Sequence, residues 1–166
     1  CDAYVPNDRH EALVSALRDG VKIHDALQEF STDPGPAPLA EIREAIDRCF
    51  SSDSVEAIGS ALAAEGSEWA QKQLSIMAGK SPTSQKISFR QLREGAEITF
   101  DACMIMEYRM TQRLMEGGDF FEGVRAVVID KDMTPKWRPD TLVELTTENV
   151  EAFFRPLSEK DLTFPA

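Results

Sequence analysis

Three basic residues recur at helical spacing in a chain that is otherwise acidic. Lys86, Arg90 and Arg93 stand at positions i, i+4 and i+7, which lie on one face of an α-helix. The 166-residue chain has a net charge of -11, so this basic stripe stands out. It could bind phosphate groups or dock onto an acidic surface. It could also be a solvated helix face whose cations pair with neighbouring acids, and the sequence leaves both interpretations open.

A second basic cluster lies near the carboxyl end of the chain. Lys131, Lys136 and Arg138 are close to Trp137, and the same two interpretations apply to them. Trp137 stands between two prolines in a segment without helical periodicity. That context predicts an extended loop that is anchored by the indole ring.

The other residues that could do chemistry do not form a catalytic or metal-binding set. His10 and His24 lack the spacing of a zinc-binding helix. Residues 130–134 begin like a calcium loop, but Pro135 replaces its glycine and Thr141 its glutamate. Motifs of serine hydrolases, P-loop proteins and dinucleotide-binding folds are absent. We therefore predict no catalytic residue, no metal site and no cofactor site in the chain.

Composition disfavours several classes of function. A chain with this net charge repels nucleic acid, whose binding requires a basic face. The longest aliphatic run, residues 126–129, is far shorter than the roughly 20 residues that cross a bilayer. Cys1, Cys49 and Cys103 are too widely spaced for a disulfide framework or a zinc knuckle. We expect a soluble, intracellular protein with reduced thiols.

Capping residues, prolines and glycines divide the chain into short helices. Residues 1–6 predict the end of a strand, followed by an N-cap at Asn7 or Asp8. Three prolines and a glycine in residues 31–38 predict the main loop. The first helix is predicted to follow this N-cap and to end at Gly20. Further helices are predicted at about residues 22–30, 39–49, 54–65, 68–78 and 81–95.

The longest predicted helix, residues 97–116, has apolar residues on more than one face. Such a helix is buried on several sides or covered by a partner. After it, Asp119 and Glu122 have the spacing of a capping box, which predicts another helix start. A last helix is predicted at about residues 147–154. The pattern as a whole predicts a mainly α-helical fold.

Three segments resemble a known family. Residues 119–139, DFFEGVRAVVIDKDMTPKWRP, resemble the carboxyl-terminal signature of 3-hydroxyisobutyryl-CoA hydrolases, a branch of the enoyl-CoA hydratase/isomerase (crotonase) superfamily. Residues 81–95 (SPTSQKISFRQLREG) and 107–113 (EYRMTQR) follow in the order and spacing of that family. Residues 49–58 (CFSSDSVEAI) look like part of a helical insertion in the same branch.

The resemblance implies the helical C-terminal region of a crotonase-like fold, without the α/β spiral core. Residues 1–20 would contain the last core element and the first helix, residues 21–80 the insertion, and residues 81–166 the C-terminal module. The catalytic carboxylates and oxyanion-hole amides of the family lie in the core. The chain alone is therefore expected to be inactive, and its start without methionine is interpreted as a cut within a longer polypeptide.

For the complete protein, the resemblance implies hydrolysis of an acyl-CoA thioester, 3-hydroxyisobutyryl-CoA, in valine breakdown. Expected partners are the protein's own N-terminal core, the acyl-CoA substrate and further copies in a homo-oligomer, but neither nucleic acid nor a membrane. The expected location is cytoplasmic, or the mitochondrial matrix in a eukaryote. An enoyl-CoA hydratase or isomerase and a non-enzymatic helical interaction module are the alternatives.

The resemblance also bears on which residues meet the substrate. A gap-free alignment on Glu122 and Gly123 places the family's CoA-binding lysine on Asp130 and its arginine on Lys131. At the aligned positions, this chain therefore lacks the residues that usually contact CoA in the family. The expected substrate-binding residues are the three cations of the basic stripe (Lys86, Arg90 and Arg93) together with Lys131.

Overall fold

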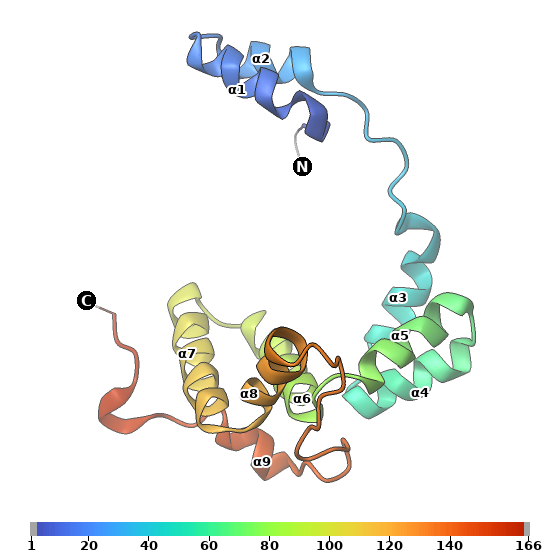
Figure 1. Ribbon diagram of the computed structural model, residues 1–166, viewed down its shortest axis with the longest axis vertical. Coiled ribbons are helices and arrows are strands. Elements are labelled where there is room, and N and C mark those ends of the chain that lie inside the picture. Colours follow the sequence, from blue (N-terminus) through green and yellow to red (C-terminus); the bar gives the residue numbers. More distant parts are fainter. Residues whose placement is uncertain (1–2, 165–166) are drawn as a thin grey trace. The chain divides into compact units, whose positions relative to one another are not determined.

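The computed structural model describes residues 3–164 and divides into two compact units, residues 1–44 and 45–166 (Figure 1). Within the described residues the regular structure is helical and strands are absent, so the prediction of a mainly α fold is confirmed. In chain order the helices are η1 (Asn7–Arg9), α1 (His10–Arg18), α2 (Ile23–Phe30), η2 (Ala40–Ile42), α3 (Arg43–Phe50), α4 (Val55–Glu65), α5 (Glu68–Ala78), α6 (Pro82–Gly95), α7 (Phe100–Glu116), α8 (Asp119–Val124), the π-helix η3 (Arg125–Ile129), α9 (Thr147–Ala152) and η4 (Ser158–Lys160).

The first unit is built around α1 and α2, which pack against each other. Gly20 joins them with a φ of 87°, a left-handed conformation that favours glycine. Ala26 of α2 is fully buried. After α2 the chain returns to the start of the unit, where the Thr32 amide donates to the Tyr4 carbonyl at 2.9 Å.

The start of this unit differs from the prediction. Asn7 and Asp8 do not cap α1, because they belong to the 3-10 helix η1, in which the Arg9 amide donates to the Pro6 carbonyl at 2.9 Å. The helix α1 follows directly, without a side-chain cap. Residues 3–6 are not a strand, and the first two residues of the predicted strand lie outside the described range.

In the second unit, helix starts follow the predicted capping chemistry. Ser54, Ser67 and Ser81 each accept a hydrogen bond from the amide three residues later. Thr99 caps α7 in the same way, although that helix begins three residues after the predicted start at residue 97. Such caps satisfy an amide that has no partner within the helix. The last helix, α9, begins at the predicted residue but ends two residues early, and its capping box is formed by Thr146.

Two hydrophobic clusters make up the core of the second unit, and α6 contributes to both. Ile87 of α6 is 1% exposed and belongs to a cluster with α7, α9 and Leu145. Phe89, two residues further along α6, packs against a cluster formed by α3, α4 and α5. The members of the first cluster are Ile87, Met106, Met110, Leu145 and Val150, and those of the second are Cys49, Ile58, Leu62 and Ala70. The helix α6 therefore joins α3–α5 to α7 and α9.

The start of α8 corrects another prediction. Asp119 is the first residue of α8 and does not form a capping box, because its buried carboxylate bonds to distant partners. One oxygen accepts from the Ser81 hydroxyl at 2.6 Å and the other from the Arg138 amide at 2.9 Å. Ser81 also caps α6. This pair thus joins the starts of α6 and α8 to the loop after η3.

Trp137 anchors that loop, although its ring is only half-buried. The indole nitrogen donates to the Gly79 carbonyl at 3.0 Å. The ring lies against Gly123 so closely that a Cβ added there would be 3.3 Å from the indole. Gly123 therefore permits the close approach of loop and helix, and the predicted anchoring role is confirmed.

Candidate functional site

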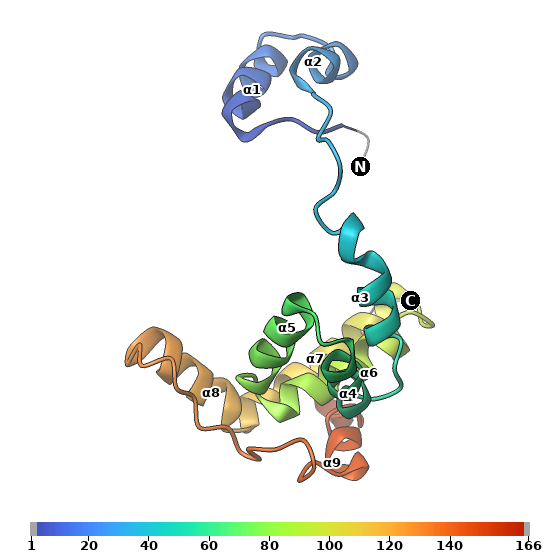
Figure 2. The same cartoon turned by 90° about the vertical axis from the view of Figure 1, so that its right-hand side faces the viewer.

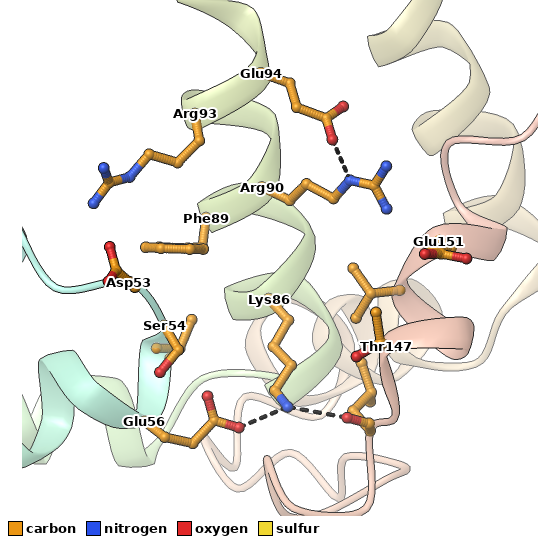
Figure 3. Close-up of a pocket in the computed structure, with 13 residues that line it drawn as sticks. Asp53, Ser54, Glu56, Lys86, Phe89, Arg90, Arg93, Glu94, Thr147 and Glu151 are labelled. Atoms are coloured by element: carbon orange, nitrogen blue, oxygen red, sulfur yellow. Dashed lines mark hydrogen bonds and ion pairs between the residues drawn. The ribbon is translucent and has the colours of Figure 1, made fainter.

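The basic stripe borders a pocket of the second unit (Figure 3). This pocket has a volume of about 480 Å³ and opens where α6 meets the start of α4 and the start of α9. Its lining residues are Asp53, Ser54, Val55, Glu56, Lys86, Phe89, Arg90, Arg93, Glu94, Leu145, Thr147, Val150 and Glu151. The structure therefore brings Lys86, Arg90 and Arg93 to one site, as the helical spacing predicted.

Lys86 is engaged on both sides. Its ammonium group lies 2.6 Å from the Glu56 carboxylate of α4 and donates to the Leu145 carbonyl at 3.0 Å. Burial raises the pKa of Glu56, but hydrogen bonds from Lys86 and the backbone outweigh it, so the pKa lies below its usual value. Lys86 thus holds the start of α4 and the segment before α9 against α6.

Arg93 serves a similar purpose at the other end of the stripe. Its guanidinium donates to the carbonyls of Ser51 and Ser52 at 3.3 and 2.9 Å. It also lies over the Phe89 ring, 5.2 Å from the ring centroid. Arg93 therefore fixes the loop between α3 and α4 to α6.

Arg90 keeps more of its donor capacity. Its Nε bonds to Glu94 at 2.5 Å, and its guanidinium lies 4.2 Å from the centroid of the Phe154 ring. Its two terminal nitrogens have no hydrogen-bond partner within residues 3–164. Figure 3 shows this guanidinium on the Glu151 side of α6, away from Arg93. Arg90 is therefore the stripe residue with donors left for a ligand.

The charge balance of the pocket limits what it can bind. Three cations and four carboxylates line it, so the site as a whole does not attract anions strongly. Its lining contains neither histidine nor cysteine, and no nucleophile is paired with a base. The arrangement can orient a ligand, but it does not supply the groups that acyl transfer requires.

Lys131 lies in a different part of the same unit. It does not line this pocket, and its exposed side chain projects from the loop after η3. Lys131 and Met133 both have positive φ angles, 55° and 56°, which non-glycine residues seldom adopt. The fourth expected substrate-binding residue is therefore not brought together with the basic stripe.

Arg125 organises this loop, a role that the sequence reasoning missed. It pairs with Glu122 at 2.8 Å, Asp130 at 2.7 Å and Asp132 at 2.6 Å, and it donates to the Thr134 carbonyl at 3.2 Å. The hydrogen bond from Arg125 is the main cause that lowers the pKa of both Glu122 and Asp132 to about 2. The signal for this cluster in the sequence was the presence of three acids within seven residues of one arginine.

Within residues 3–164, histidine, cysteine and acidic side chains do not come together in a group that could hold a metal ion. No helix in that range has both the length and the apolar character of a membrane span.

A comparison with family models identifies the superfamily. The model of the enoyl-CoA hydratase/isomerase family matches residues 1–154. The chain belongs to this family. The resemblance seen in residues 81–95, 107–113 and 119–139 is therefore confirmed.

Curated relatives within the enoyl-CoA hydratase/isomerase family place the chain near one branch. The mitochondrial 3-hydroxyisobutyryl-CoA hydrolase of Danio rerio is 46% identical over 149 residues, which cover 89% of this chain and 39% of the relative. The Homo sapiens enzyme of the same name is 47% identical over 126 residues, or 76% of this chain and 33% of the relative. The chain thus spans two fifths or less of the length of these relatives.

Two solved structures share the fold of this chain. A carnitinyl-CoA dehydratase from Mycobacterium thermoresistibile superposes with a TM-score of 0.88 at 34% identity. An enoyl-CoA hydratase from Rhodobacter sphaeroides 2.4.1 gives a TM-score of 0.80 at 28% identity. Each match covers 99% of this chain and 47% of the solved chain. The helical arrangement of this chain therefore recurs as about half of each of these two larger chains.

Proposed function

We propose that this chain is the C-terminal portion of an acyl-CoA thioester hydrolase that acts on 3-hydroxyisobutyryl-CoA in valine breakdown. The identity of 44–48% to curated 3-hydroxyisobutyryl-CoA hydrolases is the observation that carries this proposal. Because several of those relatives are mitochondrial, a eukaryotic source would place the protein in the mitochondrial matrix. The helices would cover the acyl-CoA cleft and pack against the core.

The chemistry of the site indicates which groups this chain would supply and which would come from the core. Thioester hydrolysis requires donors for the oxyanion and a group that promotes attack on the carbonyl carbon. The pocket beside α6 has free donors on Arg90 but no nucleophile paired with a base, so we assign the oxyanion donors and the catalytic group to the core, as the family resemblance implies. The three segments, residues 1–20, 21–80 and 81–166, would then be the end of the core, the insertion and the C-terminal module.

The test is a hydrolysis assay on the full-length polypeptide that contains this chain. Release of free CoA from 3-hydroxyisobutyryl-CoA, followed with a thiol reagent, should show turnover, whereas residues 1–166 alone should show none. Hydration of an enoyl-CoA is the second arm, because the solved structures that match are named as a dehydratase and a hydratase. Hydration without hydrolysis would replace the proposal by a hydratase.

The substrate contacts within the chain form a second part of the proposal. Lys86, Arg90, Arg93 and Lys131 were the expected contacts, and Arg90 and Lys131 are the two whose charged groups have donors to offer. We propose that these two reach CoA phosphates, and that Lys86 and Arg93 act mainly by docking α4 and its preceding loop onto α6.

Replacing Arg90 by glutamine in the full-length enzyme should raise KM roughly tenfold with little change in kcat. A charge-assisted hydrogen bond remote from the thioester stabilises the bound substrate and the transition state equally, so its loss weakens binding and not the chemical step. The matched variant Lys86→Met should leave KM unchanged and lower Tm by about 2–4 °C, which corresponds to about 1 kcal/mol. Steady-state kinetics and a thermal melt separate the two. A lower Tm with unchanged KM for Arg90→Gln would assign it to docking as well.

A further inference from the structure

A second pocket of the same unit lies where the end of α7 meets the last part of the described chain. Residues 153–164, here called the tail, follow α9 and are held against α7 (Figure 2). Arg109 of α7 pairs with the Asp161 carboxylate, to which its Nε donates at 2.9 Å. One turn further along α7, Arg113 donates to two tail carbonyls at 3.2 and 3.4 Å. These bonds fix the tail as one wall of the pocket.

The pocket between α7 and the tail, here called the tail pocket, has a volume of about 830 Å³. Tyr108, Gln112 and Glu116 line it from α7. They stand four positions apart, so they share one face of that helix. The tail contributes Ser158 and Lys160. The two walls therefore bring polar side chains from distant parts of the sequence to one place.

Most donors of the tail pocket have no acceptor. The side chains of Tyr108, Gln112, Ser158 and Lys160 carry hydroxyl, amide and ammonium donors, and none of these bonds to another group in the part of the chain that the structure describes. The Nε of Arg113 is buried and also lacks a hydrogen-bond partner there. Because a donor that is left without an acceptor costs free energy, a ligand rich in acceptors would gain bonds here that the protein does not itself make.

The charge of the tail pocket favours an anion. Two cations, Arg113 and Lys160, line it with one carboxylate, Glu116. In the pocket beside α6, by contrast, the acids outnumber the cations. The nearby carboxylate of Asp161 is already paired with Arg109. A cleft with an excess of positive charge attracts anions locally, even on a chain that is acidic as a whole.

We propose that the tail pocket is a binding site for a phosphate ester or a diphosphate. Arg113 and Lys160 neutralise the charge of this ligand, and the hydroxyl and amide donors of the lining bond to its oxygens. A phosphate group fits this donor set better than a carboxylate does, because it offers three strong acceptor oxygens and a carboxylate offers two. The phosphate belongs either to the CoA moiety of a substrate or to a separate small molecule, and the test below distinguishes these sources.

Calorimetric titration of the full-length polypeptide with inorganic diphosphate at low ionic strength tests the site. We expect saturable binding with a Kd of about 1 mM or below, and Lys160→Met should weaken it at least about tenfold. Lys160 suits this test because its ammonium group has no partner within the described residues, so its loss does not loosen the tail as a change at Arg113 would.

Two further variants separate a specific site from general attraction or damage to the fold. Glu116→Gln removes the carboxylate of the lining and should tighten diphosphate binding about threefold, a gain that a damaged fold does not produce. Arg155→Met removes a cation of the tail that does not line the pocket and pairs with acids of α9. Its Kd should stay within about twofold of that of the unaltered protein.

Amine labelling gives a readout at the site itself. Diphosphate should slow the acetylation of Lys160 at least about fivefold, because a bound anion favours the charged ammonium form, which does not react. Lys72, an exposed lysine of α5, should react at the same rate with and without diphosphate. Peptide mapping by mass spectrometry follows the two lysines separately.

The outcomes are distinct from those that test the proposed function. Absence of saturable binding, or equal losses in Lys160→Met and Arg155→Met, would overturn the tail pocket as a site, whether or not the protein hydrolyses the thioester. If the site is confirmed, a parallel rise in KM for the acyl-CoA in Lys160→Met would assign the phosphate to the substrate. An unchanged KM would assign it to a separate molecule.

Discussion

Replacing Ile87 by alanine should lower the free energy of unfolding of the second unit by about 2–5 kcal/mol. Ile87 is 1% exposed and lies in the cluster formed with α7, α9 and Leu145. The substitution removes buried methyl groups and leaves a cavity that close-packed neighbours fill only in part. Urea unfolding followed by tryptophan fluorescence measures the loss, because Trp69 and Trp137, the two tryptophans of the chain, are both in this unit.

Leu92 is the matched control for this substitution. It lies on the same helix but is 74% exposed, so Leu92→Ala should change the free energy of unfolding by less than about 0.5 kcal/mol. If both variants lost the same amount, α6 would not be the shared core helix that the structure shows.

Acid should release the loop after η3 in a defined pH range. Glu122 has a folded pKa of about 2 against an ordinary value of 4.5, so folding favours its ionised form. Its contribution is complete above about pH 4.5 and is lost as the pH falls towards about 2. Hydrogen exchange of the Met133 and Lys136 amides, which close this loop, should accelerate across that range relative to the intrinsic rate.

The cause of this acid response is assigned to Arg125. In Arg125→Met the Glu122 pKa, measured by carboxyl NMR, should return towards 4.5 and the two loop amides should lose protection already at neutral pH. Arg138→Met is the control, since Arg138 lies in the same loop without an ion pair. A pKa near 4.5 in the unaltered protein would contradict the geometry of the cluster.

Local chemistry explains which features could be predicted from the sequence. A serine at an N-cap acts on an amide three residues away, so the starts at Ser54, Ser67 and Ser81 needed no knowledge of the fold. The helical spacing of the basic stripe likewise placed its members on one face. Family resemblance added what the residues alone could not, namely the superfamily and the branch.

Long-range competition explains the features that the sequence did not reveal. Asp119 has the local pattern of a cap, but Ser81 approaches from 38 residues earlier and binds its carboxylate. The partners of the stripe are distant as well, since Lys86 finds Glu56 and Arg93 finds the carbonyls of Ser51 and Ser52. Hydrophobic spacing does not report such pairings, because it describes only one helix at a time.

The position of α6 between two hydrophobic clusters also affects how this region could have changed during evolution. A deletion of α3–α5 would expose Phe89 and remove the acid that pairs with Lys86 and the carbonyls that bind Arg93. A descendant that lost these helices would therefore need compensating substitutions on α6 at the same time. Gain or loss of these helices should be accompanied in lineages by changes at positions 86, 89 and 93, with a polar residue in place of Phe89 where its ring would otherwise face water.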